Sequence, residues 1–291
     1  MTLKQEFDTL MKKSSDYEEC VFSKLNEFYF NAKYQKAFQY ELEEYEQFDK
    51  FKVREFTPIG KKGDKEQLIK MCSISSSSRL AFLYFRKQLE NGYELEYECP
   101  NGLKTNLNPQ LDAFDKKSNT YFECKCHEIC DNHTDHLKIS YEEKLVKLFG
   151  FSKEELKKCE KTIKNGKVYE ITLEEFGINK IPNQLKYTIN SSIYDLHLDV
   201  KQLICHLVGI ENCNKRKRAN LQYIFFTPNN VDIKRNVHID KLYDELLAEW
   251  KMILNSKRMK YLLNNFANIK ILKPKFVEIS KIHDEIYNAI K

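Results

Sequence analysis

The chain contains few of the residues that build loop-rich, repetitive or membrane-spanning proteins. Its 291 residues include only 8 Gly and 6 Pro, which argues against a loop-rich or repeat scaffold. No stretch approaches the roughly 18 consecutive apolar residues that a membrane span needs. Residues 1–13 are polar and charged, so we expect no secretory signal peptide. We therefore expect no membrane partner.

Cysteine is plentiful, but its number does not favour a disulfide framework. Nine Cys is an odd count, and free thiols in a reducing compartment are the simpler interpretation, so we predict a cytoplasmic protein. Hydrophobic residues make up 42% of the chain, which is enough to bury a core. The net charge of +5 permits nucleic-acid binding without requiring it. Signatures of cysteine proteases, GxSxG hydrolases and phosphate-binding loops are also missing.

Hydrophobic spacing predicts a helical region at the start of the chain. Val21, Leu25 and Phe28 recur at helical intervals, so residues 1–70 are predicted to be helical. A turn-rich stretch at 57–65 is a plausible boundary.

A mixed core is predicted to follow, over residues 71–235, with an insertion at about 129–195. Residues 236–291 are predicted to be mostly helical, with a strand-like stretch between the helices. Within the insertion, Ser152 and Glu155 resemble a capping box that opens a helix reaching about Lys164.

The core begins with a helix signal and continues with alternating residues. Ser75 to Ser78 offer N-cap candidates, and Gly92 is a C-terminal stop. Period-two alternation then predicts three strands, the last two joined by a hairpin, at 93–99, 110–114 and 120–127.

Beyond the insertion, the pattern predicts a second helix and a buried strand. An apolar stripe from Val200 to Val208 predicts an amphipathic helix that ends at Gly209. The apolar run at 221–227 is typical of a strand buried on both faces.

Acidic and basic side chains concentrate on the predicted hairpin. Glu123 and Lys125 share one face of their strand, with Cys124 turned away, and the hairpin brings Asp112 beside them. Two carboxylates suit Mg²⁺, which takes few protein ligands and leaves positions for water and phosphate. The lysine can orient the attacking water and neutralise developing charge.

In this context the sequence resembles the PD-(D/E)XK superfamily of restriction-endonuclease-like nucleases. The resemblance lies in Pro109, Asp112, Glu123 and Lys125 on a strand-hairpin-strand frame. It implies an α/β fold with a restriction-endonuclease-like α-β-β-β-α-β core. Two departures are the spacing of Asp112, three residues after Pro109 rather than one, and the long insertion.

The resemblance also implies a function, a Mg²⁺-dependent deoxyribonuclease, with Mn²⁺ as an alternative metal. Asp112 and Glu123 would bind the metal, together with the Cys124 carbonyl, and Lys125 would assist water. DNA is the expected partner, RNA remains open, and a homodimer is compatible with the class. Restriction, another defence role or repair is the implied setting. Target sequence and endo- or exonuclease action are not readable from the chain.

Two further groups are candidate site residues. Asp199, Gln202 and His206 form one polar face of the second helix, and Gln202 and His206 resemble a pair that some superfamily members aim at the site. An ordinary exposed face is the alternative. Four consecutive cations are candidates for contacting backbone phosphates or for a solvated loop: Lys215, Arg216, Lys217 and Arg218.

Other interpretations remain open for the same residues. Asp112, Glu123 and Lys125 could line the solvated face of a hairpin. The fold could also carry a catalytically inactive nucleic-acid-binding module. A zinc-containing module is a third alternative, with ligands spaced as Cys126, Cys130, His133 and His136.

Overall fold

The computed structural model describes most of the chain. The described residues are 2–15, 21–24, 27–47, 71–103, 108–131, 136–163, 166–171, 175–178, 197–214, 217–266 and 268–290. The predicted boundary at 57–65, Leu25, His133, Lys215 and Arg216 lie outside them.

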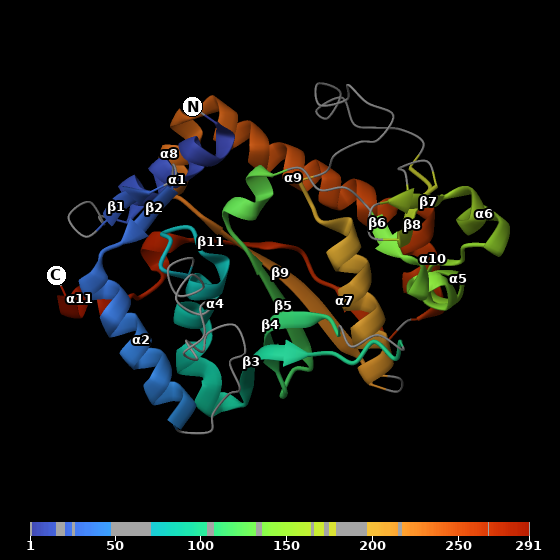
Figure 1. Ribbon diagram of the computed structural model, residues 1–291, viewed down its shortest axis with the longest axis horizontal. Coiled ribbons are helices and arrows are strands. Elements are labelled where there is room, and N and C mark those ends of the chain that lie inside the picture. The colour runs from blue at the N-terminus through green and yellow to red at the C-terminus, as the bar shows by residue number, and fades with distance from the viewer. Residues whose placement is uncertain are drawn as a thin grey trace.

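A mixed β-sheet runs through the centre of the molecule (Figure 1). Its order is β10-β9-β5-β4-β3, and β11 also pairs with β9. The strands are β3 (Tyr93–Glu98), β4 (Gln110–Asp115), β5 (Thr120–Lys125), β9 (Ala219–Thr227), β10 (Ile269–Ile271) and β11 (Lys275–Glu278). β3, β4 and β5 form an antiparallel meander, whereas β9 is parallel to β5. The predicted α/β class and the predicted core strands are therefore confirmed.

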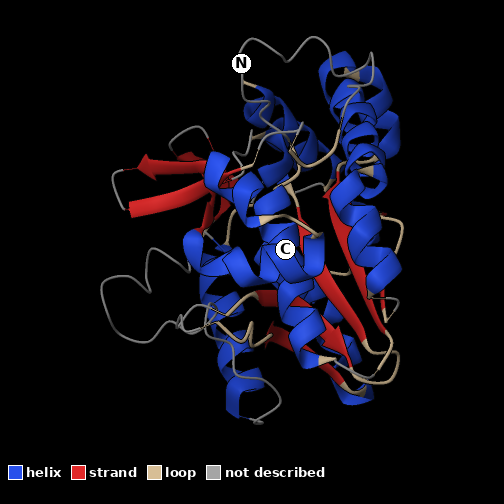
Figure 2. Cartoon of the chain, turned by 90° about the vertical axis from the view of Figure 1, so that its right-hand side faces the viewer, coloured by secondary structure: helices blue, strands red, loops and turns tan. Residues whose placement is uncertain are grey.

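Helices lie on both sides of the strands (Figure 2). On one side, α4 (Ser77–Phe85) begins at the N-cap Ser76 and continues as a 3₁₀ turn, Arg86–Asn91, that ends at Gly92 with a φ of 94°. Glycine adopts this left-handed conformation without steric cost, so Gly92 is the stop that the sequence predicts. The ring of Phe85 packs 5.0 Å from that of Phe122 on β5.

The second core helix, α7 (Val200–Cys213), does not end at Gly209 as predicted. Gly209 is inside the helix, where a Cβ would lie 2.7 Å from both Cys99 Cβ and Pro109 Cγ. The glycine therefore permits close packing of α7 against the β3–β4 connection rather than ending the helix.

We expect Gly209→Ala to destabilise the protein by about 1–3 kcal/mol, because the added methyl group overpacks this contact. Alanine normally stabilises a helix interior relative to glycine, so the sign of the effect isolates the steric cost. Urea unfolding measures it, with Lys201→Ala at an exposed position of α7 as the control. A Gly209→Ala protein as stable as the wild type would show that α7 can move away.

The insertion forms a unit of helices and a small sheet. Its elements are a 3₁₀ turn at His127–Cys130, β6 (His136–Lys138), a 3₁₀ turn at Ile139–Tyr141, α5 (Glu142–Phe149), α6 (Lys153–Lys158), β7 (Glu160–Ile163) and β8 (Gly166–Glu170). The capping box of Ser152 and Glu155 is confirmed, but the helix ends at Lys158 and not near Lys164. β7 pairs with β8 instead, because Thr162 and Ile163 are β-branched and favour a strand.

The N-terminal region is only partly helical. α1 (Leu3–Ser14) and α2 (Ala32–Gln47) flank an antiparallel hairpin of β1 (Val21–Lys24) and β2 (Glu27–Phe30). The helical prediction is therefore wrong for residues 21–24 and 27–30. Aromatic and β-branched residues at this point favour a pleated surface, and their intervals also fit a helix.

The C-terminal region belongs to the same sheet as the core. After α8 (Asn230–Arg235), which ends the predicted core, it contains α9 (Val237–Asn255), α10 (Lys257–Asn265), a 3₁₀ turn at Ile279–Lys281 and α11 (Glu285–Ile290). Between the helices, β10 and β11 run parallel to β9 along its outer edge. The predicted strand-like stretch is therefore a pair of short strands that extends the central sheet.

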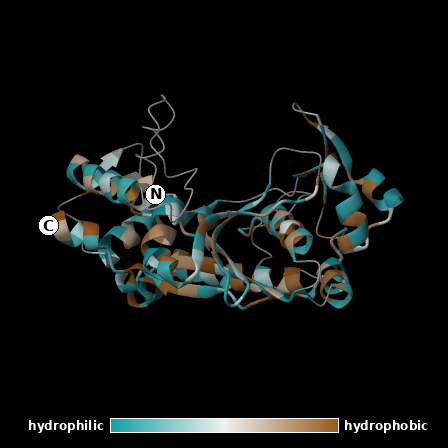
Figure 3. Ribbon diagram, turned by 90° about the horizontal axis from the view of Figure 1, so that it is seen from below, coloured by the Kyte–Doolittle hydropathy of each residue, from teal (hydrophilic) through white to brown (hydrophobic). Residues whose placement is uncertain are grey.

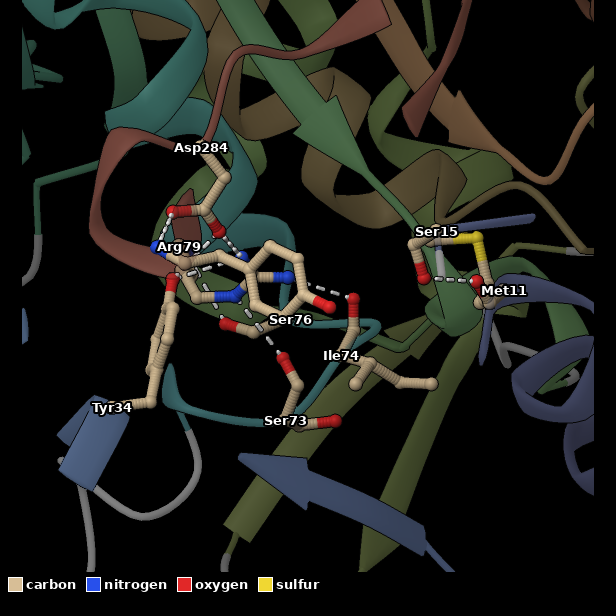
Figure 4. Close-up of polar contacts among 9 residues, drawn as sticks. Met11, Ser15, Tyr34, Ser73, Ile74, Ser76, Arg79 and Asp284 are labelled. Atoms are coloured by element: carbon tan, nitrogen blue, oxygen red, sulfur yellow. Dashed lines mark hydrogen bonds and ion pairs between the residues drawn. The ribbon is translucent and has the colours of Figure 1, made fainter. Parts of the chain in front are cut away.

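A buried ion pair joins the N-terminal region, α4 and the C-terminal region (Figure 4). The Arg79 side chain is fully buried, and its Nη1 lies 3.1 Å from Asp284 Oδ2. The Tyr34 hydroxyl donates to the same carboxylate oxygen at 2.8 Å, and Arg79 also donates to the carbonyls of Ser73 and Ile74. Segments distant in sequence are thus connected through one guanidinium group.

The helices mix hydrophobic and hydrophilic residues along their length, as expected for helices with one buried face (Figure 3). In the described part of the chain, no helix combines the length and the apolar character that crossing a bilayer requires.

Candidate active site

The β4–β5 hairpin brings the two candidate carboxylates together. The strands pair as far as Ala113 with Phe122, so the next step of the register places Asp112 opposite Glu123 on the face covered by α7. Beyond the last paired residues, the hairpin is held by a side chain: Asp112 Oδ2 accepts a hydrogen bond from Cys124 N–H at 2.6 Å. The Cys124 side chain is buried and lies on the opposite face of β5.

Lys125 lies within a group of three carboxylates. Its Nζ is 2.7 Å from Glu123 Oε1, and the charges of Glu128 and Asp112 also act on it. Burial lowers the pKa of Lys125, but the attraction of Glu123, Glu128 and Asp112 outweighs burial and raises it above the usual value. The lysine is therefore a fixed cation beside the acids.

Burial and like charge act against ionisation of the two acids. Burial raises the pKa of Asp112 well above its ordinary value, and the neighbouring charge of Glu123 raises it further. Burial also raises the pKa of Glu123, while Lys125 opposes that shift. A divalent cation at this point would favour the ionised form of both carboxylates.

Glu128 is a third acid that the sequence did not single out. It follows β5 in a 3₁₀ turn, accepts from Cys126 N–H at 2.7 Å and binds the Ser77 hydroxyl at the start of α4. Burial raises the pKa of Glu128, but Lys125 and His127 outweigh burial and lower it. Its position directly after the predicted strand was the available signal.

α7 contributes a neutral histidine to the site. His206 Nε2 lies 3.6 Å from Glu123 Oε2, and the ring is buried. Burial and the charge of Lys125 lower the pKa of His206 to about 3, so this contact is not an ion pair near neutral pH. Tyr223 on β9 lies 3.3 Å from His206 Nδ1 and can donate to it when the proton is on Nε2. Tyr223 had no sequence signal, because it is within an apolar strand.

The site is neither a solvated hairpin face nor an ordinary exposed helix face. Glu123 is 3% exposed and His206 is 1% exposed, which excludes both alternatives for these two residues. Asp112 is partly exposed, and 17% of the Lys125 side chain reaches solvent. Asp112 and Lys125 are therefore on the side of the cluster that touches solvent.

The other predicted residues lie on α7 and in the connection that follows it, and the charge of Asp199 adds to the effect of burial in raising the pKa of Glu123. Asp199 is the N-cap of α7 and accepts from Gln202 N–H at 2.8 Å. Within the described residues, the Gln202 side chain makes no hydrogen bond to Asp112, Glu123 or Lys125. Lys217 and Arg218 are exposed in the connection between α7 and β9, beyond the other end of the helix.

The described residues contain no group of three or more His, Cys, Asp or Glu side chains arranged to hold a metal ion. Cys126, Cys130 and His136 therefore do not form a zinc site with one another; His136 instead contacts Glu170 at 3.1 Å. A cation at Asp112 and Glu123 would have two protein carboxylates, the number typical of Mg²⁺ sites completed by water and phosphate.

Comparison with known proteins identifies no relative. No family model matches the chain, and neither does any curated protein or any solved structure.

Proposed function

We propose that the chain is a Mg²⁺-dependent nuclease of the restriction-endonuclease-like class, acting on DNA. The observation that carries the proposal is the adjacent pair Asp112 and Glu123 with Lys125 at 2.7 Å from Glu123, on a partly open side of the sheet. The order of α4, three antiparallel strands, α7 and a strand parallel to β5 supports the same class.

Asp112 and Glu123 are the residues that would hold the metal, and the Cys124 carbonyl is a proposed third ligand. Bound Mg²⁺ would polarise the scissile phosphate and acidify a bound water. The chemistry of the donors fits such an ion, because the pKa values of both carboxyls are raised and a hard divalent cation would favour their ionised form.

The remaining side chains position the reacting groups and neutralise charge on the phosphate. Lys125 reaches solvent beside Asp112, where its ammonium can orient a water and balance charge that develops on the phosphate. Glu123 pairs with Lys125 and the charge of Glu128 also attracts it, and neutral His206 contacts Glu123 without adding charge. Lys217 and Arg218 contact backbone phosphates in this proposal.

Cleavage of supercoiled plasmid, single-stranded DNA and RNA by the purified protein tests the proposal. We expect Mg²⁺ to support cleavage of DNA and a chelator to abolish it, with excess Mg²⁺ or Mn²⁺ restoring it. Gel electrophoresis of the products separates internal cuts from shortening at the ends. Cleavage that persists in chelator, or protein that leaves every substrate intact with Mg²⁺ and Mn²⁺, would contradict the proposal.

A further inference from the structure

A pocket of about 750 Å³ lies at the tip of the β4–β5 hairpin, away from the carboxylates. Among the described residues, its lining includes four cations from two loops and no carboxylate: Lys116, Lys117, Lys217 and Arg218. Lys116 pairs with Glu94, whereas the other three make no ion pair with any described residue. The pocket therefore carries uncompensated positive charge.

Aromatic rings form the wall of this pocket. Tyr97 is tilted against Phe114 with ring centroids 4.4 Å apart, and Phe114 is stacked on Tyr121 with ring centroids 4.5 Å apart. Phe114 and Tyr121 are buried, and Tyr97 is the most exposed of the three. An apolar ring thus lies beside the cations.

Hydrogen bonds hold the two cationic loops in fixed relation. Asn119, at the end of the hairpin turn with a φ of 50°, donates to Asn214 Oδ1 at 2.9 Å and to the Arg218 carbonyl at 2.8 Å. Asn214 in turn donates to the Tyr121 hydroxyl at 2.7 Å. The cations of both loops therefore face one preformed space, which lowers the entropic cost of binding.

We infer that this pocket binds a nucleoside phosphate, with the phosphate on the cations and the base against Tyr97. Cationic grooves combined with exposed aromatic rings are the usual chemistry for unpaired nucleotides. The ligand can be a free nucleotide or one nucleotide of a strand. The inference extends the phosphate contacts proposed above, but it does not depend on cleavage.

Calorimetric titration in the presence of a chelator tests the pocket with AMP, adenosine, inorganic phosphate and a short oligoadenylate. We expect AMP or the oligoadenylate to bind more tightly than both adenosine and inorganic phosphate. Tighter binding of the strand than of AMP assigns the pocket to nucleic acid, and equal binding assigns it to free nucleotide.

Two sets of variants localise the binding. Lys117→Ala combined with Lys217→Ala is expected to weaken binding about five- to tenfold and to reduce its salt dependence. The matched control combines Lys251→Ala with Lys260→Ala, which removes the same charge from exposed positions of α9 and α10 and should leave binding unchanged. Tyr97→Leu is expected to weaken binding about fivefold or more by removing the stacking surface.

Three results would overturn the inference: no binding of either nucleotide probe, binding of both nucleotide probes no tighter than that of inorganic phosphate, or equal losses from both lysine pairs. Circular dichroism of each variant shows whether it is folded. If Tyr97→Leu does not fold, the comparison of the Lys117/Lys217 pair with the Lys251/Lys260 control pair still decides the outcome. A protein that binds nucleotides but cuts no DNA would uphold this pocket and refute the nuclease proposal.

Discussion

Lys125→Met is expected to lower the rate of Mg²⁺-dependent plasmid cleavage by about 10²-fold or more, the usual effect of removing a charge that stabilises a transition state. Methionine keeps much of the side-chain volume but cannot orient water or neutralise the phosphate. Because Lys125 also pairs with Glu123, thermal unfolding must be measured beside activity. Lys251→Met, at an exposed position of α9, is the matched control and should keep full activity.

Asp112→Asn should cause a loss of similar size for a different reason. The amide oxygen can still accept from Cys124 N–H, so the hairpin is expected to persist, but the charge that would hold the metal is gone. Asp244→Asn, an exposed acid on α9, controls for the change of charge. Equal cleavage by the wild type, Lys125→Met and Asp112→Asn would exclude the proposed site.

Arg79→Met is expected to cause the largest loss of stability, about 3–5 kcal/mol, because it leaves Asp284 as a buried charge without its cation. The guanidinium carbon also lies 4.8 Å from the centre of the Phe30 ring, and this contact is lost too. Urea unfolding followed by tryptophan fluorescence measures the change. Arg235→Met, at an exposed position of α8, should change stability by less than about 0.5 kcal/mol.

A double-mutant cycle separates the ion pair from the packing around it. Asp284→Asn removes the charge and keeps one oxygen, which can accept from the Tyr34 hydroxyl or from Tyr287 N–H but not from both, because these donors bind different oxygens of the carboxylate. If the pair is the source of the loss, the double variant should be less destabilised than the sum of the single variants by about 1–3 kcal/mol. Additive losses would show that Arg79 acts through its contacts with the Ser73 and Ile74 carbonyls and the Phe30 ring rather than through the ion pair.

The core strands could be predicted because the hydrophobic pattern of each is compatible with a strand and not with a helix. Glu94, Glu96 and Glu98 alternate with apolar residues along β3, and the apolar run of β9 leaves no polar face. The same alternation placed Glu123 and Lys125 on one face, and the short turn at 115–119 fixed Asp112 beside them. Local sequence was sufficient for this part of the site.

The errors occurred where tertiary packing chooses between two local solutions. Val21 to Phe28 fits both a helix and a hairpin, and pairing between β1 and β2 decides the outcome. Gly209 suggests a helix end, but close contact with Cys99 and Pro109 explains it instead. Glu128 reaches the site from a turn and had only its position after β5 as a signal, whereas Tyr223 comes from a neighbouring apolar strand and had none.

The parallel strands β10 and β11 have a practical consequence for dissecting this protein. They cover the outer edge of β9, whose other edge is occupied by β5. A fragment restricted to 71–235 would carry the whole hairpin site, yet it would uncover an apolar strand edge that includes Phe225 and Phe226. Such an edge is a template for pairing with other chains, so the fragment should self-associate.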